Sequence, residues 1–200
     1  MLTVPDIDKV VAFATHTEGL FAWITARSTR EDARPLSEVA THVGIGFDLR
    51  VPIRCTDGSF SNLVYCDGIR GGGVMGWKNH ARLVSRLCGN SRRKLWEYTL
   101  PVAPLGALGM FKFCEESFGR FKYSERQLWL IYAMHRFGKK IVANPGEIVC
   151  SDFAGMVCSV GGFPILDLAG RDTFDSLSPA DCQRVWENLD PDWRSVRCPD

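Results

Sequence analysis

The segment Thr41–Asp48, THVGIGFD, constrains the fold more than any other stretch of the sequence. Val43, Ile45 and Phe47 alternate with His42 and two glycines, which is the period of a half-buried β-strand. Glycines on the second face indicate that another group packs closely against the backbone there. The pattern therefore predicts a sheet with one buried face, and it places His42 at the start of this strand on the glycine-bearing face.

The segment Asn62–Asp67, NLVYCD, predicts the next strand, and the Asp57-Gly58 pair predicts a turn within the connection 50–61. The two strands then form an antiparallel hairpin. Further elements are predicted as strands at 9–14 and 93–100, a loop or a strongly bent strand at 68–76, helices at 20–26, 78–87, 105–118 and 124–137, a short helix from 150, an irregular stretch to 176 and a last helix from 179. Because strands come first and helices later, the order predicts an α+β fold with an antiparallel sheet of about four to six strands packed against helices.

The length of 200 residues fits one domain over 1–200, with 190–200 as a loose tail. The net charge of +1 provides no general attraction to nucleic acid or to an anionic membrane. The first residues, MLTVPDID, lack a basic stretch followed by an apolar run, and no apolar run approaches the roughly 20 residues that span a bilayer. We therefore expect a cytoplasmic protein with no nucleic-acid partner and no integral membrane segment; the oligomeric state stays open.

The eight cysteines are scattered, with no C-x-x-C pair and no histidine spaced beside them for zinc. Their even number allows a disulfide framework, but a chain of this length with 46% hydrophobic residues does not need one. We therefore expect reduced thiols. The glycines at 71–73 do not have the spacing of a nucleotide-binding loop, and no group of residues indicates a metal or another cofactor.

One cysteine stands where a helix should begin. Turn formers at 144–147 precede Cys150, and Phe153, Val157 and Val160 follow it at helical spacing. The unpaired N–H groups and the dipole at a helix start favour an anion, so they should lower the pKa of a thiol there and make it more nucleophilic. Cys150 is thus a candidate catalytic nucleophile; the alternative is a buried, inert cysteine.

Several segments together resemble one enzyme family. THVGIGFDL, LVYCDGIRGGGV, a basic and aromatic strand, FGRFKY and IVCSDFAGMVC, in this order over 9–187, resemble the permuted NlpC-type papain-like cysteine hydrolases of the YiiX-like and YebB-like group. The resemblance implies a circularly permuted papain-like fold in which the histidine precedes the cysteine. It also implies that His42 activates Cys150 and that an acyl-enzyme forms on the sulfur.

The third catalytic residue departs from the family pattern. The family carries a Glu on the strand after the histidine strand, where this chain has Cys66. Asp67 comes one residue later and would face the other side of the sheet unless a β-bulge turned it toward His42. Otherwise another group orients His42, or the site is impaired. Asp152 replaces the Glu that follows the family's Cys-Ser, and its position in the first helical turn suits the dipole.

Other residues are weaker candidates. His16 in a turn-rich loop is a candidate border of the site, and Tyr65 and Trp77 are candidates to line a substrate pocket; a surface loop and the core are their respective alternatives. His80 in an exposed helix and His135 near the end of another are expected to be structural.

The combined prediction is a cysteine hydrolase that cleaves an amide or ester bond, with a peptide, isopeptide or acyl-amide as substrate. Peptidoglycan peptides are the habitual substrates of the wider clan. Since no export signal is visible, a role in the cell wall would require release at lysis, as for a virus-encoded enzyme, or a carrier. An intracellular peptide or lipid-amide target fits equally well. Two alternatives stay open: a non-catalytic binding or inhibitory protein that keeps the scaffold, and an acyltransferase that uses the same acyl-enzyme.

Overall fold

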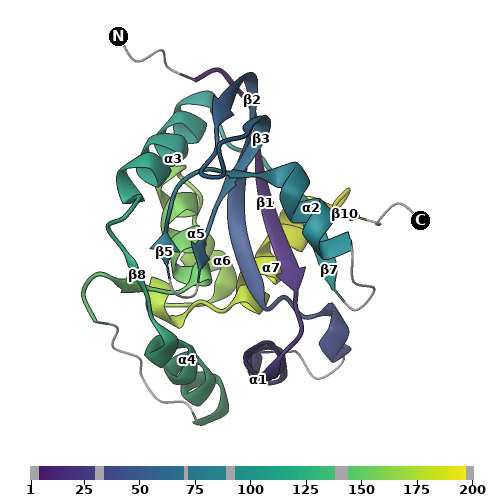
Figure 1. The fold of residues 1–200 in the computed structure, drawn as a ribbon. Helices are drawn as coiled ribbons and strands as arrows, with labels where there is room; N and C mark the ends of the chain where they lie inside the picture. Colours follow the sequence, from purple (N-terminus) through teal and green to yellow (C-terminus); the bar gives the residue numbers. More distant parts are fainter. Residues whose placement is uncertain (1–4, 30–33, 70–71, 89–92, 138–143, 197–200) are drawn as a thin grey trace.

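The computed structural model describes residues 5–29, 34–69, 72–88, 93–137 and 144–196. They form an α+β fold around a six-stranded antiparallel sheet with the strand order β10-β7-β1-β2-β3-β6 (Figure 1). The strands of this sheet are β1 (Ile7–His16), β2 (His42–Arg54), β3 (Phe60–Cys66), β6 (Lys78–Asn79), β7 (Lys94–Leu100) and β10 (Arg194–Ser195). The predicted fold class and antiparallel sheet are confirmed.

The remaining elements surround this sheet. Two small sheets pair β4 (Gly68–Ile69) with β5 (Gly73–Val74), and β8 (Lys122–Tyr123) with β9 (Glu147–Ile148). The helices are α1 (Leu20–Thr29), α2 (His80–Cys88), α3 (Pro104–Ser117), α4 (Glu125–Phe137), α5 (Cys150–Val160), α6 (Ile165–Ala169) and α7 (Pro179–Leu189), with 3-10 turns η1 (Leu36–Glu38) and η2 (Phe174–Ser176). No helix in the described part of the chain is both long and apolar enough to cross a bilayer.

One face of the sheet carries the main hydrophobic core. Val43, Ile45 and Phe47 of β2 are fully buried there, as the alternation predicted, and they belong to one cluster with residues of α3, α5 and α7. In Figure 1 these three helices lie behind the sheet, whereas α2 lies in front of it. Helix α5 therefore rests against β2 with its first residue near one end of the sheet.

The opposite face carries a smaller cluster under α2. Its buried members are Phe13, Tyr65, Leu83, Leu87 and Leu95. The Phe13 ring lies directly over a glycine of β2: a Cβ added at Gly44 would be 2.3 Å from the Phe13 Cζ. This contact confirms the prediction that another group packs against the glycine-bearing face.

Helix starts agree with their sequence signals. The Ser124 hydroxyl accepts the backbone N–H of Gln127 at 3.1 Å before α4, and the Ser178 hydroxyl accepts that of Asp181 at 3.1 Å before α7. Each hydroxyl satisfies one of the N–H groups that a helix start leaves unpaired. The local sequence therefore predicted correctly where both helices begin.

The hairpin is longer than predicted. Strand β2 continues to Arg54 and β3 begins at Phe60, so most of the predicted connection 50–61 is strand. The turn itself is at Asp57-Gly58, where Gly58 has a φ of 81° and the Asp57 carboxylate accepts the Ser59 N–H at 2.9 Å. The extension was missed because its residues are mostly exposed and so show no apolar alternation.

Two helical predictions need correction. The predicted helix 78–87 begins only at His80, because the Asn79 side chain accepts the Ala81 N–H at 3.0 Å, while Lys78 pairs with Tyr65 as part of β6. The stretch predicted as irregular up to 176 contains α6.

The prediction of a loose tail over 190–200 is wrong for its described part. Residues Arg194–Ser195 form β10, which pairs with β7, and the Asp190 carboxylate accepts the Thr99 N–H at 2.6 Å. Residues 197–200 lie outside the described residues. Segments from both ends of the chain thus share one sheet.

Candidate active site

Cys150 is the first residue of α5, as predicted. Gly146, with a φ of 80°, turns the chain into β9, and Val149 then adopts the extended conformation of an N-cap. The Asp152 carboxylate accepts the Val149 N–H at 3.1 Å and fixes this start. Cys150 is 1% exposed, and the start of β4 lies against it, since a Cβ at Gly68 would be 3.6 Å from the Cys150 Cα.

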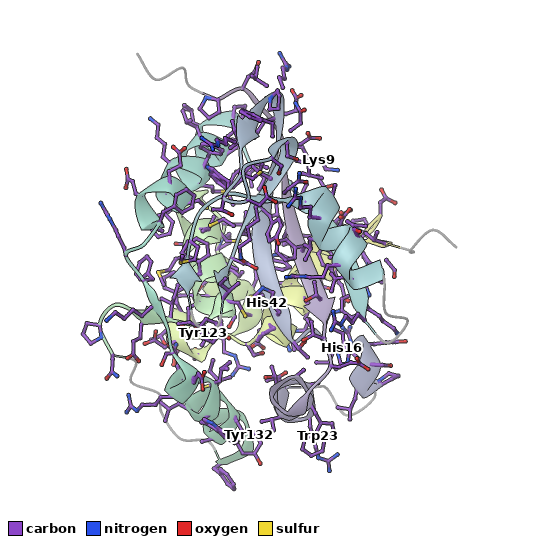
Figure 2. All side chains as sticks on the ribbon, in the orientation of Figure 1. Lys9, His16, Trp23, His42, Tyr123 and Tyr132 are labelled. Carbon is purple, nitrogen blue, oxygen red and sulfur yellow. The ribbon has the colours of Figure 1, made fainter. Side chains whose placement is uncertain are left out.

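His42 and Asp67 form a hydrogen-bonded pair at the end of the same hairpin. The His42 Nε2 lies 2.7 Å from the Asp67 Oδ2. The side chain of Asp67 is 4% exposed and that of His42 is 24% exposed. The imidazole is therefore the more solvent-accessible group of the pair. Figure 2 shows His42 between His16 and Tyr123, toward the end of the sheet where α1 and α4 lie.

The register of the hairpin explains why Asp67, rather than Cys66, reaches His42. Gly46 pairs with Tyr65 and Ile45 with Cys66, so Cys66 points into the main core, where its thiol contacts Cys114. Alternation then carries Asp67 to the face that holds Tyr65, the glycines and His42. A β-bulge was one way to turn Asp67 toward His42, but in the described ladder the register shift between β2 and β3 lies elsewhere, between Asp48 and Ile53. Asp67 therefore needs no bulge to face the imidazole.

Cys150 interacts with the same imidazole. Burial lowers the pKa of His42, but the charge of Cys150, the hydrogen bonds with Asp67 and Cys150 and the charge of Asp67 raise it to about 10. Because Asp67 occupies Nε2, the nitrogen left for Cys150 is Nδ1. The imidazole thus lies between a carboxylate and a thiol, brought together from β2, the end of β3 and the start of α5.

Lys78 joins this group and was not predicted from the sequence. Its Nζ forms an ion pair with the Asp67 Oδ1, while the Asp67 Oδ2 accepts His42. Burial raises the pKa of Asp67, but the hydrogen bond and charge of His42 and the charge and hydrogen bond of Lys78 lower it below its usual value. The sequence predicted a helix at Lys78, so its role was missed. In the structure Lys78 pairs with Tyr65 in β6, and this position directs its side chain toward Asp67.

The two aromatic residues predicted to line a pocket belong to packed clusters instead. Trp77 is 6% exposed and stacks on Phe111 with ring centroids 4.5 Å apart, so it is a core residue. Tyr65 is 4% exposed and meets the Phe13 ring edge-on at 5.0 Å. It also lines a hollow of about 200 Å³ with Lys78, and burial raises the pKa of its phenol. The structure therefore brings Tyr65 beside Lys78 and leaves Trp77 away from the site.

The other histidines have separate positions. His16 ends β1 rather than lying in a loop, and its Nδ1 is 2.9 Å from the Val39 carbonyl oxygen, so it holds the segment that leads into β2. His80 is buried rather than exposed, and its Nε2 lies 2.6 Å from the Glu97 Oε1. His135 lies near the end of α4, as predicted.

Asp152 is a second buried carboxyl group close to Cys150. It is fully buried and accepts both the Val149 N–H and the side-chain amide of Gln127. Burial raises the pKa of Asp152 well above its usual value, against the effect of these two hydrogen bonds. Its predicted place in the first helical turn is confirmed, and its contacts are those of a helix cap.

Six thiols are free and buried, those of Cys55, Cys66, Cys114, Cys150, Cys158 and Cys182. Burial raises the pKa of Cys114, Cys158 and Cys182, that of Cys158 to about 12. Within the described residues, no group of three or more His, Cys, Asp or Glu side chains is arranged to hold a metal ion. Cys150 therefore differs from these three cysteines: it contacts an imidazole, whereas burial in the core keeps their thiols protonated.

Comparisons of the chain with family models, with curated proteins and with solved structures found no match. The geometry of Cys150, His42 and Asp67 is therefore the basis on which a function is inferred.

Proposed function

We propose that this protein is a cysteine hydrolase that cleaves an amide or ester bond through an acyl-enzyme on Cys150. The observation that carries this proposal is the row Cys150–His42–Asp67, in which the imidazole is bonded to a carboxylate through Nε2 and interacts with the thiol at a helix start. A nucleophile, a base and a group that orients the base are the three parts of such a site.

In the first step, the Cys150 thiolate attacks the carbonyl carbon of the substrate, and the carbonyl oxygen becomes an oxyanion. The backbone N–H groups at the start of α5 have no partner within the helix, so the N–H of Cys150 is available to donate to that oxyanion. The dipole of α5 favours negative charge at the same place. The helix start thus stabilises both the thiolate and the intermediate.

In the second step, the His42 imidazolium gives its proton to the leaving nitrogen or oxygen, the bond from the carbonyl carbon to the leaving group breaks, and a thioester remains. The charge of Cys150 is the largest contribution that raises the pKa of His42. Once the sulfur is bonded to carbon, this charge is gone and the imidazolium is a stronger acid. The proton is therefore released more readily as the sulfur forms its new bond.

In the third step, neutral His42 takes a proton from a water molecule that attacks the thioester. The tetrahedral intermediate collapses, the bond between carbon and sulfur breaks, and the acid product leaves. The thiolate and the imidazolium are then restored. Asp67 holds the ring in one orientation throughout and stabilises its protonated form.

The substrate class is proposed on the same basis. A peptide, an isopeptide or an acyl-amide supplies the carbonyl carbon and the leaving amine that this chemistry needs. A peptidoglycan peptide is one member of that class. Action on it would require the protein to reach the cell wall, for example on lysis of the cell by a virus.

The test uses a small activated ester. Incubation of the protein with p-nitrophenyl acetate should give a burst of p-nitrophenolate and an acetyl group on Cys150, located by peptide mass mapping. Cys150→Ala should abolish the burst, whereas Cys158→Ala, which removes another free thiol from the same helix, should preserve it. Acetylation spread evenly over the cysteines would contradict the proposal.

An acyltransferase is a second candidate, favoured by the burial of Cys150, which is 1% exposed and so offers water little access. Adding an amine acceptor to the ester assay separates the two: a hydrolase releases acetate, whereas an acyltransferase forms the acetyl-amide. The non-catalytic alternative was based on the missing Glu. Asp67 now provides a carboxylate at His42, so no observation favours that alternative.

A further inference from the structure

Lys78 completes the row of side chains that ends at Cys150. Its Nζ is paired with the Asp67 Oδ1, so the carboxylate has one partner on each oxygen: Lys78 on Oδ1 and His42 on Oδ2. We propose that Lys78 is a positioning residue for the reaction, acting through Asp67 on His42. This inference rests on the proposed function of Cys150, and it adds a fourth residue to that site.

The geometry gives Lys78 a specific task. A carboxylate held at one oxygen can still rotate about its side-chain bonds, whereas partners on both oxygens fix its plane. With Oδ1 held by Lys78, Oδ2 faces the His42 Nε2 at 2.7 Å. The ring orientation that results leaves Nδ1 for Cys150. Lys78 therefore fixes the orientation of the His42 imidazole indirectly, through Asp67.

The backbone and side chain of Lys78 are themselves held in place. Its backbone pairs with Tyr65 in the sheet, and its Nζ lies 5.5 Å from the centre of the Tyr65 ring. The side chain is 18% exposed, so little of it is free in solvent. A surface lysine with many rotamers would gain little from an ion pair, but this one is already ordered by the sheet and the ring.

The charges in the row alternate in sign. Under the proposed mechanism they are the thiolate of Cys150 from α5, the imidazolium of His42 from β2, the carboxylate of Asp67 after β3 and the ammonium of Lys78 from β6. The phenol of Tyr65, from β3, lies against Lys78, and burial raises its pKa so that it stays neutral. Asp57, Arg82 and Arg86 also line the hollow beside Tyr65 and Lys78. Four alternating charges sum to zero, which suits a buried site; without Lys78 two anions would flank one cation.

Removing the ammonium should therefore change how the site titrates. In Lys78→Met, which keeps a long apolar stem, Asp67 would lose a cation that favours its charged form. Asp67 would then take up a proton at higher pH, and with it His42 would lose the partner that orients it. The acidic limb of the pH–rate profile, for any reaction of the Cys150 thiolate, should therefore shift to higher pH.

The experiment measures the rate of Cys150 alkylation by iodoacetamide from pH 4 to pH 9, by mass spectrometry of the wild type, Lys78→Met and Lys78→Arg. On the low-pH side we expect Lys78→Met to react about tenfold more slowly than the wild type, which corresponds to a shift of about one pH unit. Lys78→Arg keeps the charge and should recover most of the rate. Lys112→Met, which removes an exposed lysine from α3, should match the wild type.

Two outcomes would overturn the role of Lys78. One is a Lys78→Met profile that superimposes on that of the wild type. The other is an equal loss at every pH that arginine does not recover, accompanied by a lower melting temperature, because a purely structural lysine would behave in that way. Failure of the proposed function looks different: wild-type Cys150 itself would then react no faster than Cys158 or Cys182.

Discussion

Among the residues that the structure describes, two imidazole–carboxylate pairs lie against the sheet, and one of them adjoins a cysteine. His42 and Asp67 meet with Nε2 and Oδ2 2.7 Å apart at the end of the hairpin. His80 and Glu97 meet with Nε2 and Oε1 2.6 Å apart at the start of α2. By distance alone the two pairs are equivalent.

Their surroundings distinguish them. The His42–Asp67 contact has hydrogen-bond geometry, and Cys150 and Lys78 extend it at both ends. For His80 Nε2 and Glu97 Oε1, no hydrogen bond of suitable geometry is found among the described residues. An imidazole–carboxylate pair is therefore a common structural contact, and it becomes a candidate for catalysis only where the chain delivers a nucleophile to the free ring nitrogen.

The largest expected difference comes from removing each imidazole. In His42→Ala, alkylation of Cys150 by iodoacetamide at pH 7 should be roughly thirtyfold slower, because an unassisted thiol with a pKa of about 8.5 is only a few per cent thiolate there. His80→Ala should leave the rate unchanged. Equal effects of the two variants would remove the distinction between the pairs. The measurement is the rate of mass gain on the peptide that contains Cys150.

Removing each carboxylate should have a smaller effect. Asp67→Asn keeps the shape of the side chain but loses the charge and hydrogen bond that raise the pKa of His42. We expect alkylation to slow about tenfold, the equivalent of one pKa unit. Glu97→Gln is the matched control on the other pair and should not change the rate. A slower reaction in Glu97→Gln would show that the effect spreads through the sheet rather than acting at His42.

The pKa of His42 offers a third test, by NMR titration of the histidine ring signals. In the wild type this pKa should be near the value of about 10 that Cys150 and Asp67 produce against the effect of burial. Cys150→Ser removes the thiolate, so the pKa of His42 should fall toward its usual range. A wild-type His42 that titrates near pH 6.5 would contradict the thiolate–imidazolium pair.

The smallest effect is expected at Asp152, a buried carboxyl group that accepts the Gln127 amide, whereas Asp67 is paired with His42 and Lys78. Asp152→Asn should change the free energy of unfolding by about 1 kcal/mol, because the amide oxygen still accepts the Val149 N–H. Burial raises the pKa of Asp152, so the folded protein holds its proton to higher pH than the unfolded chain does. Wild-type stability should therefore fall relative to Asp152→Asn as the pH rises above about 4. Urea unfolding at pH 4 and pH 7 measures this; an opposite trend would show that Asp152 is charged when folded.

The local patterns predicted most of the architecture. The alternation at 42–48 located β2 and its buried face, and the serine caps located α4 and α7. The turn formers before Cys150 located the start of α5. These signals work because each depends on residues that are neighbours along the chain.

The parts that were missed depend on partners far apart in the sequence. Lys78 looked helical because its apolar followers recur at helical spacing, and only its pairing with Tyr65 makes it a strand residue. For Trp77 the sequence left a pocket and the core as alternatives, and its stacking on Phe111 shows that the core is right. The side to which Asp67 points follows from the register of β2 on β3, which a single sequence does not specify.

The order of the site residues along the chain has a consequence for protein synthesis. His42, Asp67 and Lys78 lie in β2, directly after β3 and in β6, whereas Cys150 comes about seventy residues after Lys78 in the chain. A growing polypeptide on the ribosome therefore holds the base and its supports long before it holds the sulfur. Under the proposed mechanism, the nascent chain cannot attack neighbouring proteins until α5 has emerged and docked beneath the sheet.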